Sequence, residues 1–322
     1  MPTVSGGASP RLAVGVTAAF IAYLFWGFMP LYWKMLSEAW SWEVIAHRVC
    51  WSFIVITLLL IVTGRAHEFR QTAGQLRRRP PLALMLVAAA MFAGLNWWIN
   101  VLAVQIDRVV ELGIGMFLTP LISMALGFLI FRERLSRLHV LSIAIAAAGV
   151  VVMTAGYGRI PVIALGVSST WAIYGAFKKK ITINPWVSNA LESLIMMPLA
   201  LVYLWNLHAA GEGHFLATGF SGLSCALVGT GIITSIPMIA FAYSALNLPM
   251  YLLGFCQFLN PVLTILVGVF ILGSPFNPAF AVPLVFIAVS VAVFLWAELK
   301  GVHVTRKVLE HAGKTGGRKG EP

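Results

Sequence analysis

Four ionisable side chains lie inside long apolar runs of the sequence, where charged residues are otherwise rare. His47 and Arg48 share one run, Glu192 lies in another, and Glu111 opens a third. An ionised group at the centre of a membrane span costs ~2.5–3.5 kcal/mol on insertion scales, so such groups usually face the interior of a helix bundle and pair there. We therefore expect Arg48 and Glu192 to form a polar centre, with Glu111 and His47 as contacts for a proton or a solute.

Arg48 and Glu192 are expected at different heights in the bilayer. At ~1.5 Å per helical residue, Arg48 lies ~10 Å from the outer edge of the hydrocarbon core and Glu192 ~10 Å from its inner edge. Their long side chains can then meet across the midplane, directly or through water, and Glu111 is an alternative partner for Arg48. Other interpretations stay open: Arg48 snorkels to the interface, Glu111 caps a helix N-terminus, and His47 is a packing residue.

Aromatic and amide side chains accompany these charges. An apolar and aromatic cavity with a few polar groups is what a small organic solute needs. The alternative is that tryptophan and tyrosine only anchor helices at the membrane interfaces, and we assign that role to Trp33, Trp40 and Trp42. The candidates for lining a cavity are Trp26, Asn96, Trp97, Tyr174 and Gln257.

The composition indicates which kind of secondary structure positions these residues. Of 322 residues, 60% are hydrophobic and 10% are charged, whereas a soluble protein has roughly 45–50% apolar and about 25% charged residues. Such a chain cannot cover a water-facing surface, which excludes a disordered protein, a disulfide scaffold and an ordinary soluble enzyme. A β-barrel is disfavoured because its strands alternate polar and apolar residues. We predict an all-α polytopic membrane protein.

Charged or turn-rich breaks divide the chain into ten apolar segments, each near the roughly 20 residues that a helical span needs. The first is too long for a signal-peptide core and is expected to be retained as a helix. The stretch Gly213–Ala297 contains no Lys, Arg, Asp or Glu, and we place its breaks at Asn247–Pro249 and Ser274–Pro278. The predicted spans are 12–33, 41–63, 82–104, 109–131, 138–155, 160–177, 185–207, 221–246, 248–273 and 279–297.

Basic residues are distributed unequally between the two sides of this topology. With the N-terminus inside, the inner segments hold 18 of the 22 Lys and Arg residues and the outer side holds 4. Cytoplasmic segments of membrane proteins carry such an excess. We therefore expect ten transmembrane helices in the plasma membrane, with both termini in the cytoplasm.

The two halves of the chain carry a repeated pattern. Shifted by 141 residues, 112–130 aligns with 253–271, with seven identities in 19 positions that include paired glycine and proline residues. Because five helices is an odd number, the second half would begin on the opposite side of the membrane. Many secondary transporters use such inverted repeats to alternate access around a midplane site. The expected domains are an N-terminal tail 1–11, a first repeat 12–157, a second repeat 158–298 and a basic cytoplasmic tail 299–322.

The remaining motifs do not predict catalysis. Cys50, Cys225 and Cys256 lie in apolar runs, at spacings that match neither a metal site nor a disulfide framework. Gly219–Gly222 looks like the serine motif of rhomboid-type proteases, but no histidine follows it before His303, and that chemistry needs a histidine base. The net charge of +11 fits basic cytoplasmic loops better than nucleic-acid binding. We expect no enzyme activity, cofactor, metal or nucleic-acid partner.

Short strings spread over residues 12–297 carry a family resemblance. The most specific is His47-Arg-Val-Cys-Trp-Ser-Phe53. The others are Ala22–Gly27 with Pro30, Asn96-Trp97, Glu111–Gly113 with Pro120, Tyr174-Gly175 before three lysines, Glu192, and Phe255–Phe258 with Pro261. They resemble the RarD proteins of the EamA group in the drug/metabolite transporter superfamily. The resemblance implies a ten-helix inner-membrane transporter built from two inverted five-helix repeats.

One position departs from the family pattern. Where the family often has Gly-Glu at the end of the ninth helix, this chain has Gly273-Ser-Pro, whereas Glu133 keeps an acidic residue in the first repeat. The loss weakens any expectation that both repeats use a symmetric acidic anchor there.

The resemblance and the inverted repeat together predict a secondary transporter. It would move a small organic metabolite or drug-like solute across the plasma membrane by alternating access. The sequence has no ATP-binding loop of the form G-x-x-x-x-G-K-[ST], so a gradient or a partner subunit would supply the energy. The alternatives are a lipid-carrier flippase and a non-transporting membrane sensor or partner subunit. The expected partners are the solute and the lipid bilayer, with a homodimer as an option.

Overall fold

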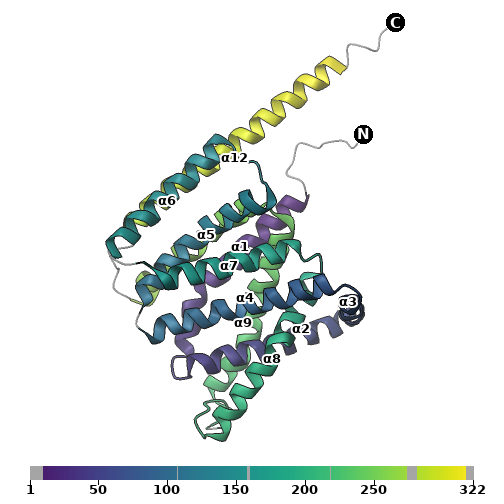
Figure 1. Ribbon diagram of the computed structural model, residues 1–322, viewed down its shortest axis with the longest axis vertical. Coiled ribbons are helices and arrows are strands. Elements are labelled where there is room, and N and C mark those ends of the chain that lie inside the picture. The colour runs from purple at the N-terminus through teal and green to yellow at the C-terminus, as the bar shows by residue number, and fades with distance from the viewer. Residues whose placement is uncertain (1–9, 107, 158–159, 218, 274–280, 317–322) are drawn as a thin grey trace. The chain divides into compact units, whose positions relative to one another are not determined.

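The computed structural model describes residues 10–106, 108–157, 160–217, 219–273 and 281–316, and the regular elements in these residues are all helices (Figure 1). In chain order they are α1 Pro10–Met35, α2 Ser41–Val62, α3 Ala66–Arg78, α4 Pro80–Gln105, α5 Val109–Phe131, α6 Arg137–Tyr157, α7 Val162–Lys180, α8 Pro185–Ala209, α9 Gly222–Asn247, α10 Met250–Gln257, α11 Leu259–Leu266, the π-helical turn η1 Val267–Ile271 and α12 Ala281–Gly316.

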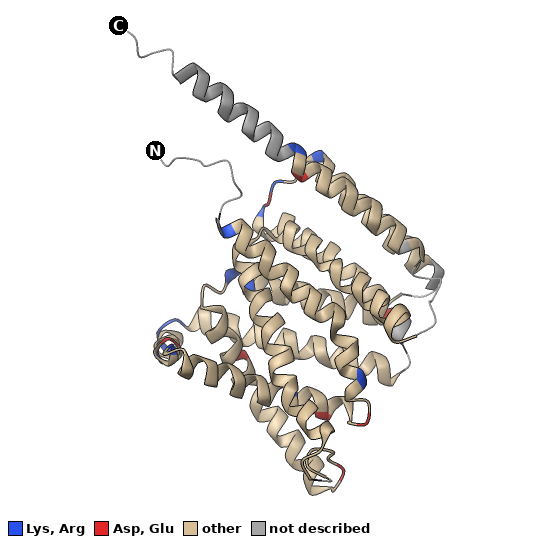
Figure 2. Ribbon diagram, turned by 180° about the vertical axis from the view of Figure 1, so that it is seen from behind, with Lys and Arg blue, Asp and Glu red and all other residues tan. Residues whose placement is uncertain are grey.

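Eight helical segments within the described part of the chain are long and apolar enough to cross a membrane. They are α1, α2, α4, α5, α6, α8, α9 and the continuous stretch from α10 to η1. Figure 2 shows long stretches of helix that contain no Lys, Arg, Asp or Glu. Most of these charged residues lie near helix ends and connections. The prediction of a polytopic α-helical membrane protein is confirmed. Helices α7 and α12 occupy the other two predicted positions but are not among the eight.

Some predicted boundaries lie elsewhere in the structure or beyond what it describes. Helix α7 continues to Lys180, three residues past the predicted end at 177, and α12 continues to Gly316, past the predicted end at 297. The turn predicted at Ser274–Pro278 and most of the tail predicted at 1–11 lie outside the described residues.

Helix α3 is a short polar helix between α2 and α4. It begins beside an ion pair in which Arg65 Nε donates to Glu68 Oε1 at 2.6 Å. This hydrogen bond lowers the pKa of Glu68 below its ordinary value. Asn184 Nδ2, in the connection before α8, donates to the other oxygen of Glu68 at 2.8 Å. The α3 segment is therefore tied to the end of the bundle at which α7 stops.

The helices separate into two compact units. The smaller contains α6 and α12, which pack against each other. Ser142 Oγ donates to the Ser290 carbonyl at 2.9 Å, and Ser290 Oγ donates to the Ser142 carbonyl at 2.8 Å. These reciprocal bonds satisfy two buried hydroxyls between apolar helices. The larger unit comprises residues 11–133 and 159–276, so each predicted repeat supplies helices to both units.

Close helix crossings build the larger unit. Helix α2 packs against α8 and α9, α5 against α7 and α10, and α4 against α7 and α8. At Gly231 of α9, an added Cβ would lie 2.5 Å from the carbonyl carbon of Trp51 in α2. At Gly115 of α5, an added Cβ would lie 3.0 Å from the Cα of Ala164 in α7. Small residues let these backbones approach, as is usual between membrane helices.

Contacts between helix ends define two faces of the larger unit. On the first, which we call the basic face, the Asn184–Glu68 bond joins the start of α8 to α3. On the second, the opposite face, Glu43 Oε2 lies 2.8 Å from His214 Nδ1 and joins the start of α2 to the α8–α9 connection. The basic face comprises the helix ends near 62–80, 131–133, 178–185 and 247–250, and the opposite face those near 35–41, 105–109, 160–162 and 209–222.

The span predicted at 248–273 corresponds to one candidate membrane span, Met250–Ile271, in which the helix is interrupted at Phe258. Helix α10 ends at Gln257 and α11 begins at Leu259, two residues before Pro261. Proline has no backbone N–H, so Pro261 cannot donate to the carbonyl of Gln257. Pro30 and Pro120 lie within α1 and α5, which remain continuous helices. Pro261 alone therefore does not explain the interruption between α10 and α11, which also depends on the residues around it.

The close crossing at Gly231 can be tested directly. Gly231→Ala should destabilise the protein because the added methyl group meets the main chain of α2, which cannot rotate away. Overpacking of this kind costs about 1–3 kcal/mol. Gly268→Ala is the matched control, because nothing lies within 4 Å of its added Cβ. Thermal unfolding of the two purified variants in detergent should show a lower melting temperature for Gly231→Ala alone. Equal melting temperatures would contradict this packing.

Candidate functional site

A cavity of about 540 Å³ lies within the larger unit. It is lined from α1, α2, α4, α5, α7, α10 and α11. It reaches the opposite face at the α1–α2 connection, where the lining residues Ser37 and Ser41 are exposed. Its aromatic lining residues are Tyr23, Trp26, Trp33, Trp97 and Trp171, and its main polar ones are Arg48, Asn96, Asn100, Thr119, Gln257 and Asn260.

Arg48 projects from α2 into this cavity between two tryptophan rings. Its guanidinium carbon lies 5.0 Å from the ring centroid of Trp33 in α1 and 4.7 Å from that of Trp97 in α4. Its Nε donates to Thr234 Oγ1 of α9 at 3.0 Å. A cation over a tryptophan face is stabilised by about 0.5–1 kcal/mol at exposed sites and about 2 kcal/mol or more when desolvated. Trp33, which we predicted as an interfacial anchor, also lines the cavity.

No neighbouring carboxylate in the described part of the chain neutralises the charge of Arg48. Among the described residues, no ion pair joins Arg48 to Asp or Glu. It is also the one charged side chain in the described cavity lining. The described lining therefore carries a single positive charge.

Amide side chains on α4 hold one wall of the cavity. Asn96 Nδ2 donates to the Val167 carbonyl at 2.8 Å and to Thr170 Oγ1 at 3.0 Å, which fixes α4 against α7. Asn100 Nδ2 in turn donates to the Asn96 carbonyl at 2.7 Å. Satisfied buried amides of this kind are rigid. Gln257 lines the cavity from α10, and its Oε1 accepts from Ser123 at 3.1 Å.

Five aromatic rings close the inner end of the cavity, and we call them the aromatic plug. Trp26 stacks edge-on against Trp171 at 5.2 Å between ring centroids, and Trp171 lies 5.1 Å from Tyr174. Tyr174 stacks on Phe241 at 5.7 Å, and Tyr23 meets Phe241 at 6.4 Å. Tyr23, Trp26 and Trp171 line the cavity, whereas Tyr174 and Phe241 are fully buried behind them.

A buried ion pair lies beyond the plug. Glu192 Oε1 lies 2.6 Å from Lys178 Nζ, and both side chains are 2% exposed. Ser188 Oγ donates to the same oxygen at 2.8 Å, and the Tyr174 hydroxyl donates to Glu192 Oε2 at 3.0 Å. The carboxylate is thus neutralised and hydrogen-bonded, as a buried charge must be. Tyr174 links this pair to the aromatic plug.

Arg48 and Glu192, the predicted polar centre, are not bonded to each other. Arg48 bonds Thr234 and Glu192 bonds Lys178. Both residues line a second void of about 10 Å³, which is close to the volume that one water needs. Between these two described residues no direct contact is formed, since each bonds another neighbour. A pairing through water stays a prediction.

Glu111 and His47 lie outside the cavity lining, at the opposite face. Glu111 Oε1 accepts from the Ile163 N–H at 2.5 Å, at the start of α7, where a carboxylate is favoured by the helix dipole. This is the capping role that we considered as the alternative for Glu111. His47 Nδ1 accepts from Trp51 Nε1 at 3.1 Å, and its Nε2 lies 4.0 Å from Glu43 Oε1.

The nine predicted site residues therefore fall into three groups. Five of them line the cavity, two join the buried ion pair, and two lie towards the opposite face, where Glu111 caps α7 and His47 bonds Trp51 within α2. The cavity group is Trp26, Arg48, Asn96, Trp97 and Gln257. The ion-pair group is Tyr174 and Glu192, and the third group is His47 and Glu111. Their contribution to solute binding stays a prediction.

Sequence reasoning missed Lys178, Trp171 and Thr234. Lys178 was assigned to a basic loop because it opens a run of three lysines, although it follows Tyr174 by one helical turn. Residues four apart share a helix face, and this spacing could have placed Lys178 beside Tyr174. Thr234 lies in an uncharged span that offers no comparable signal.

The buried pair gives a double-mutant test. Lys178→Met should strongly destabilise the protein because Glu192 keeps its charge without a partner, and Glu192→Gln should do the same to Lys178. Breaking such a pair costs about 3–5 kcal/mol, whereas removing both charges is often nearly neutral. The double variant should therefore melt above either single variant in detergent. Lys180→Met, at the exposed lysine two residues on, is the control. A double variant as unstable as the sum of the singles would contradict the pairing.

Comparisons with known proteins agree with this architecture. Residues 13–155 match the EamA-like transporter family. A transporter of Bacillus subtilis strain 168, YojE, is 31% identical over 288 residues, which cover 89% of this chain and 95% of that protein. The RarD protein of Escherichia coli strain K12 is 31% identical over 281 residues, which cover 87% and 93%.

A crystal structure that is 19% identical to this chain has the same fold. It superposes with a TM-score of 0.67 over 88% of this chain and 97% of that one. Together with the identities above, which extend over almost the full length of both chains, these matches place the protein. The chain belongs to the RarD proteins of the EamA-like transporter family.

Proposed function

We propose that this protein is a secondary transporter that moves a small organic solute across the plasma membrane by alternating access, with the 540 Å³ cavity as its solute site. The cavity carries the proposal, because it lies inside a bundle of membrane-type helices, is open at one face and is closed at the other by the aromatic plug. A non-transporting sensor would be expected to fill such a hollow. A flippase would need a groove open to lipid along its length.

The pairing of helices supports the proposed topology of ten spans in two inverted repeats. The second and seventh predicted spans are α2 and α8, which pack together, as do α5 with α10 and α6 with α12. Each of these pairs consists of equivalent helices from the two predicted repeats, which is compatible with inverted repeats. With both termini in the cytoplasm, the basic face is cytoplasmic and the cavity opens to the outside.

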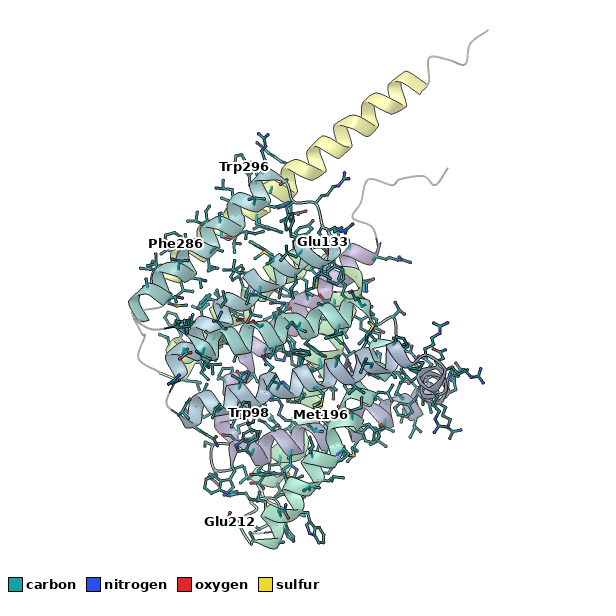
Figure 3. The ribbon with its side chains drawn as sticks, in the orientation of Figure 1. Trp98, Glu133, Met196, Glu212, Phe286 and Trp296 are labelled. Carbon is teal, nitrogen blue, oxygen red and sulfur yellow. The ribbon has the colours of Figure 1, made fainter. Side chains whose placement is uncertain are left out.

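A charged contact holds the basic face closed, and we call it the latch. Glu133, just after α5 (Figure 3), accepts from the Met250 N–H at 2.7 Å and from the Tyr251 N–H at 3.0 Å. Lys179 Nζ, on α7, lies 3.6 Å from Glu133 Oε1 and donates to the Leu248 carbonyl at 2.5 Å. The latch therefore ties α5, α7 and α10 together. Release of a solute to this face requires the latch and the aromatic plug to part.

The proposed cycle follows from these contacts. A solute enters from the opposite face, binds between α1, α4 and α5, and replaces water around Arg48. Closure of the opposite face around the solute is then coupled to opening of the latch. In this scheme the Lys178–Glu192 pair is the buried charge that must stay compensated while the helices around it move.

Blocking the cavity should abolish transport. Met116→Trp adds bulk to the α5 wall of the cavity, whereas Leu129→Trp adds the same bulk at a position on α5 that is 69% exposed. Proteoliposomes are loaded with a mixture of small metabolites, and their release is followed by mass spectrometry. Wild type and Leu129→Trp should release the same subset, and Met116→Trp should release none of it. Equal release from all three would contradict the cavity as the solute path. Protein-dependent scrambling of a fluorescent lipid alone would favour the flippase.

Weakening the latch should open the basic face. Glu133→Gln removes the charge that holds Lys179 and weakens the cap on α10. The reporter is Ala245→Cys, a fully buried position one turn before Leu248, with the three native cysteines replaced by alanine. We expect a water-soluble maleimide to label this cysteine several-fold faster in Glu133→Gln than in Glu38→Gln, whose carboxylate is exposed on the opposite face. Equal labelling rates would show that Glu133 does not hold this face closed.

A further inference from the structure

The cavity lining also indicates which solutes it accepts. Resting on the transporter function proposed above, we infer that the solute is an organic anion: a carboxylate carried on an apolar, largely aromatic body, with the carboxylate bound by the guanidinium of Arg48. Three independent features of the described residues lead to this class of solute.

The first feature is the charge of the cavity. Arg48 is the one charged residue in the described lining, and no carboxylate pairs with it there. The acidic residues nearby in the fold are engaged elsewhere, since Glu192 binds Lys178 and Glu43 binds His214. A cationic solute would meet an uncompensated like charge in a medium of low dielectric, where repulsion is strong. An anionic solute supplies the missing countercharge.

The second feature is the orientation of the guanidinium. Among the described residues, its Nε is the nitrogen with a hydrogen-bond partner, the hydroxyl of Thr234. Trp33 and Trp97 hold the guanidinium carbon at 5.0 and 4.7 Å from their ring centroids. The two terminal nitrogens thus remain for a ligand, and a guanidinium presents them as a fork that matches a carboxylate. Thr234 is a positioning residue in this arrangement.

The third feature is the apolar wall next to Arg48. Trp26, Val101, Leu112 and Met116 line the cavity together with the two tryptophans that flank the guanidinium. Their surfaces suit a ring or an aliphatic chain, and the 540 Å³ volume falls within the roughly 300–1,000 Å³ of small-molecule sites. A purely inorganic anion would leave this wall uncovered. Arg48 and the apolar wall together therefore favour a solute that has both a carboxylate and an apolar body.

The test uses probes that share one body and differ in the charged group. Phenylacetate, phenylacetamide and phenethylamine form one set; indole acetate, indole acetamide and tryptamine form a second; hexanoate, hexanamide and hexylamine form a third. Binding to the purified full-length protein is measured by thermal shift and by titration. At least one carboxylate should bind, and it should bind roughly tenfold or more tightly than its amide and amine. Short-chain phosphatidic acid is added to distinguish a lipid phosphate from a soluble carboxylate.

Variants assign the effect to Arg48. Arg48→Gln should remove the preference for the carboxylate over the amide, and Arg48→Lys should retain part of it, because lysine keeps the charge but not the fork. Lys34→Gln, which removes an exposed charge at the opposite face, should have no effect. Thr234→Val, which leaves the charge in place, should weaken the carboxylate several-fold and leave the amide unchanged. This last variant keeps the test valid if Arg48→Gln fails to fold.

Each outcome decides between the two proposals. Amides or amines that bind as well as carboxylates, or binding of carboxylates that is unchanged in Arg48→Gln, would overturn the anion class while leaving the cavity as a solute site. Preference for phosphatidic acid, or the absence of binding by every carboxylate, would overturn it as well. Loss of the proposed transport function is recognised separately, by equal solute release from wild type and Met116→Trp proteoliposomes.

Discussion

The structure depends on how one arginine is held inside an apolar bundle. Arg48 is placed on α2 with its guanidinium between the rings of Trp33 and Trp97 and with Nε bonded to Thr234. Three helices besides its own, α1, α4 and α9, must converge for these contacts to exist. A charge in this position is costly, and the aromatic faces offset part of that cost without neutralising it. The guanidinium therefore keeps an uncompensated positive charge that faces the cavity.

Other charges of the larger unit show the opposite arrangement. Lys178 and Glu192 neutralise each other at 2.6 Å, and Glu133 is engaged by two N–H groups and Lys179 at the basic face. Those contacts stabilise one packed conformation, whereas Arg48 faces open space. The aromatic plug lies between the cavity around Arg48 and the Lys178–Glu192 pair, and its Tyr174 hydroxyl donates directly to Glu192. In the proposed cycle, movement of the plug would be transmitted to the ion pair through this hydrogen bond.

Helix positions could be predicted from the sequence, because each span needs a run of apolar residues bounded by charges or turns. The span predicted at 185–207 is α8, Pro185–Ala209, and that at 41–63 is α2, Ser41–Val62. Five of nine predicted site residues line the cavity for the same reason: a polar or aromatic residue deep in a span has few other places to go. Side-chain partners could not be predicted, since they depend on which helices touch. Lys178 looked like a loop lysine, but packing buries it against Glu192, and Trp33, predicted as an interfacial anchor, also lines the cavity.

The most direct measurement is a crystal structure of the protein with a brominated aryl carboxylate, in which anomalous scattering locates the bromine and the electron density shows the carboxylate. We expect a bromine peak within the cavity, against the apolar wall near Met116, and carboxylate oxygens within hydrogen-bond distance of the terminal nitrogens of Arg48. A bromine peak outside the cavity, or a carboxylate that points away from Arg48 with the guanidinium unchanged, would show that this arginine is not held open for an anionic solute.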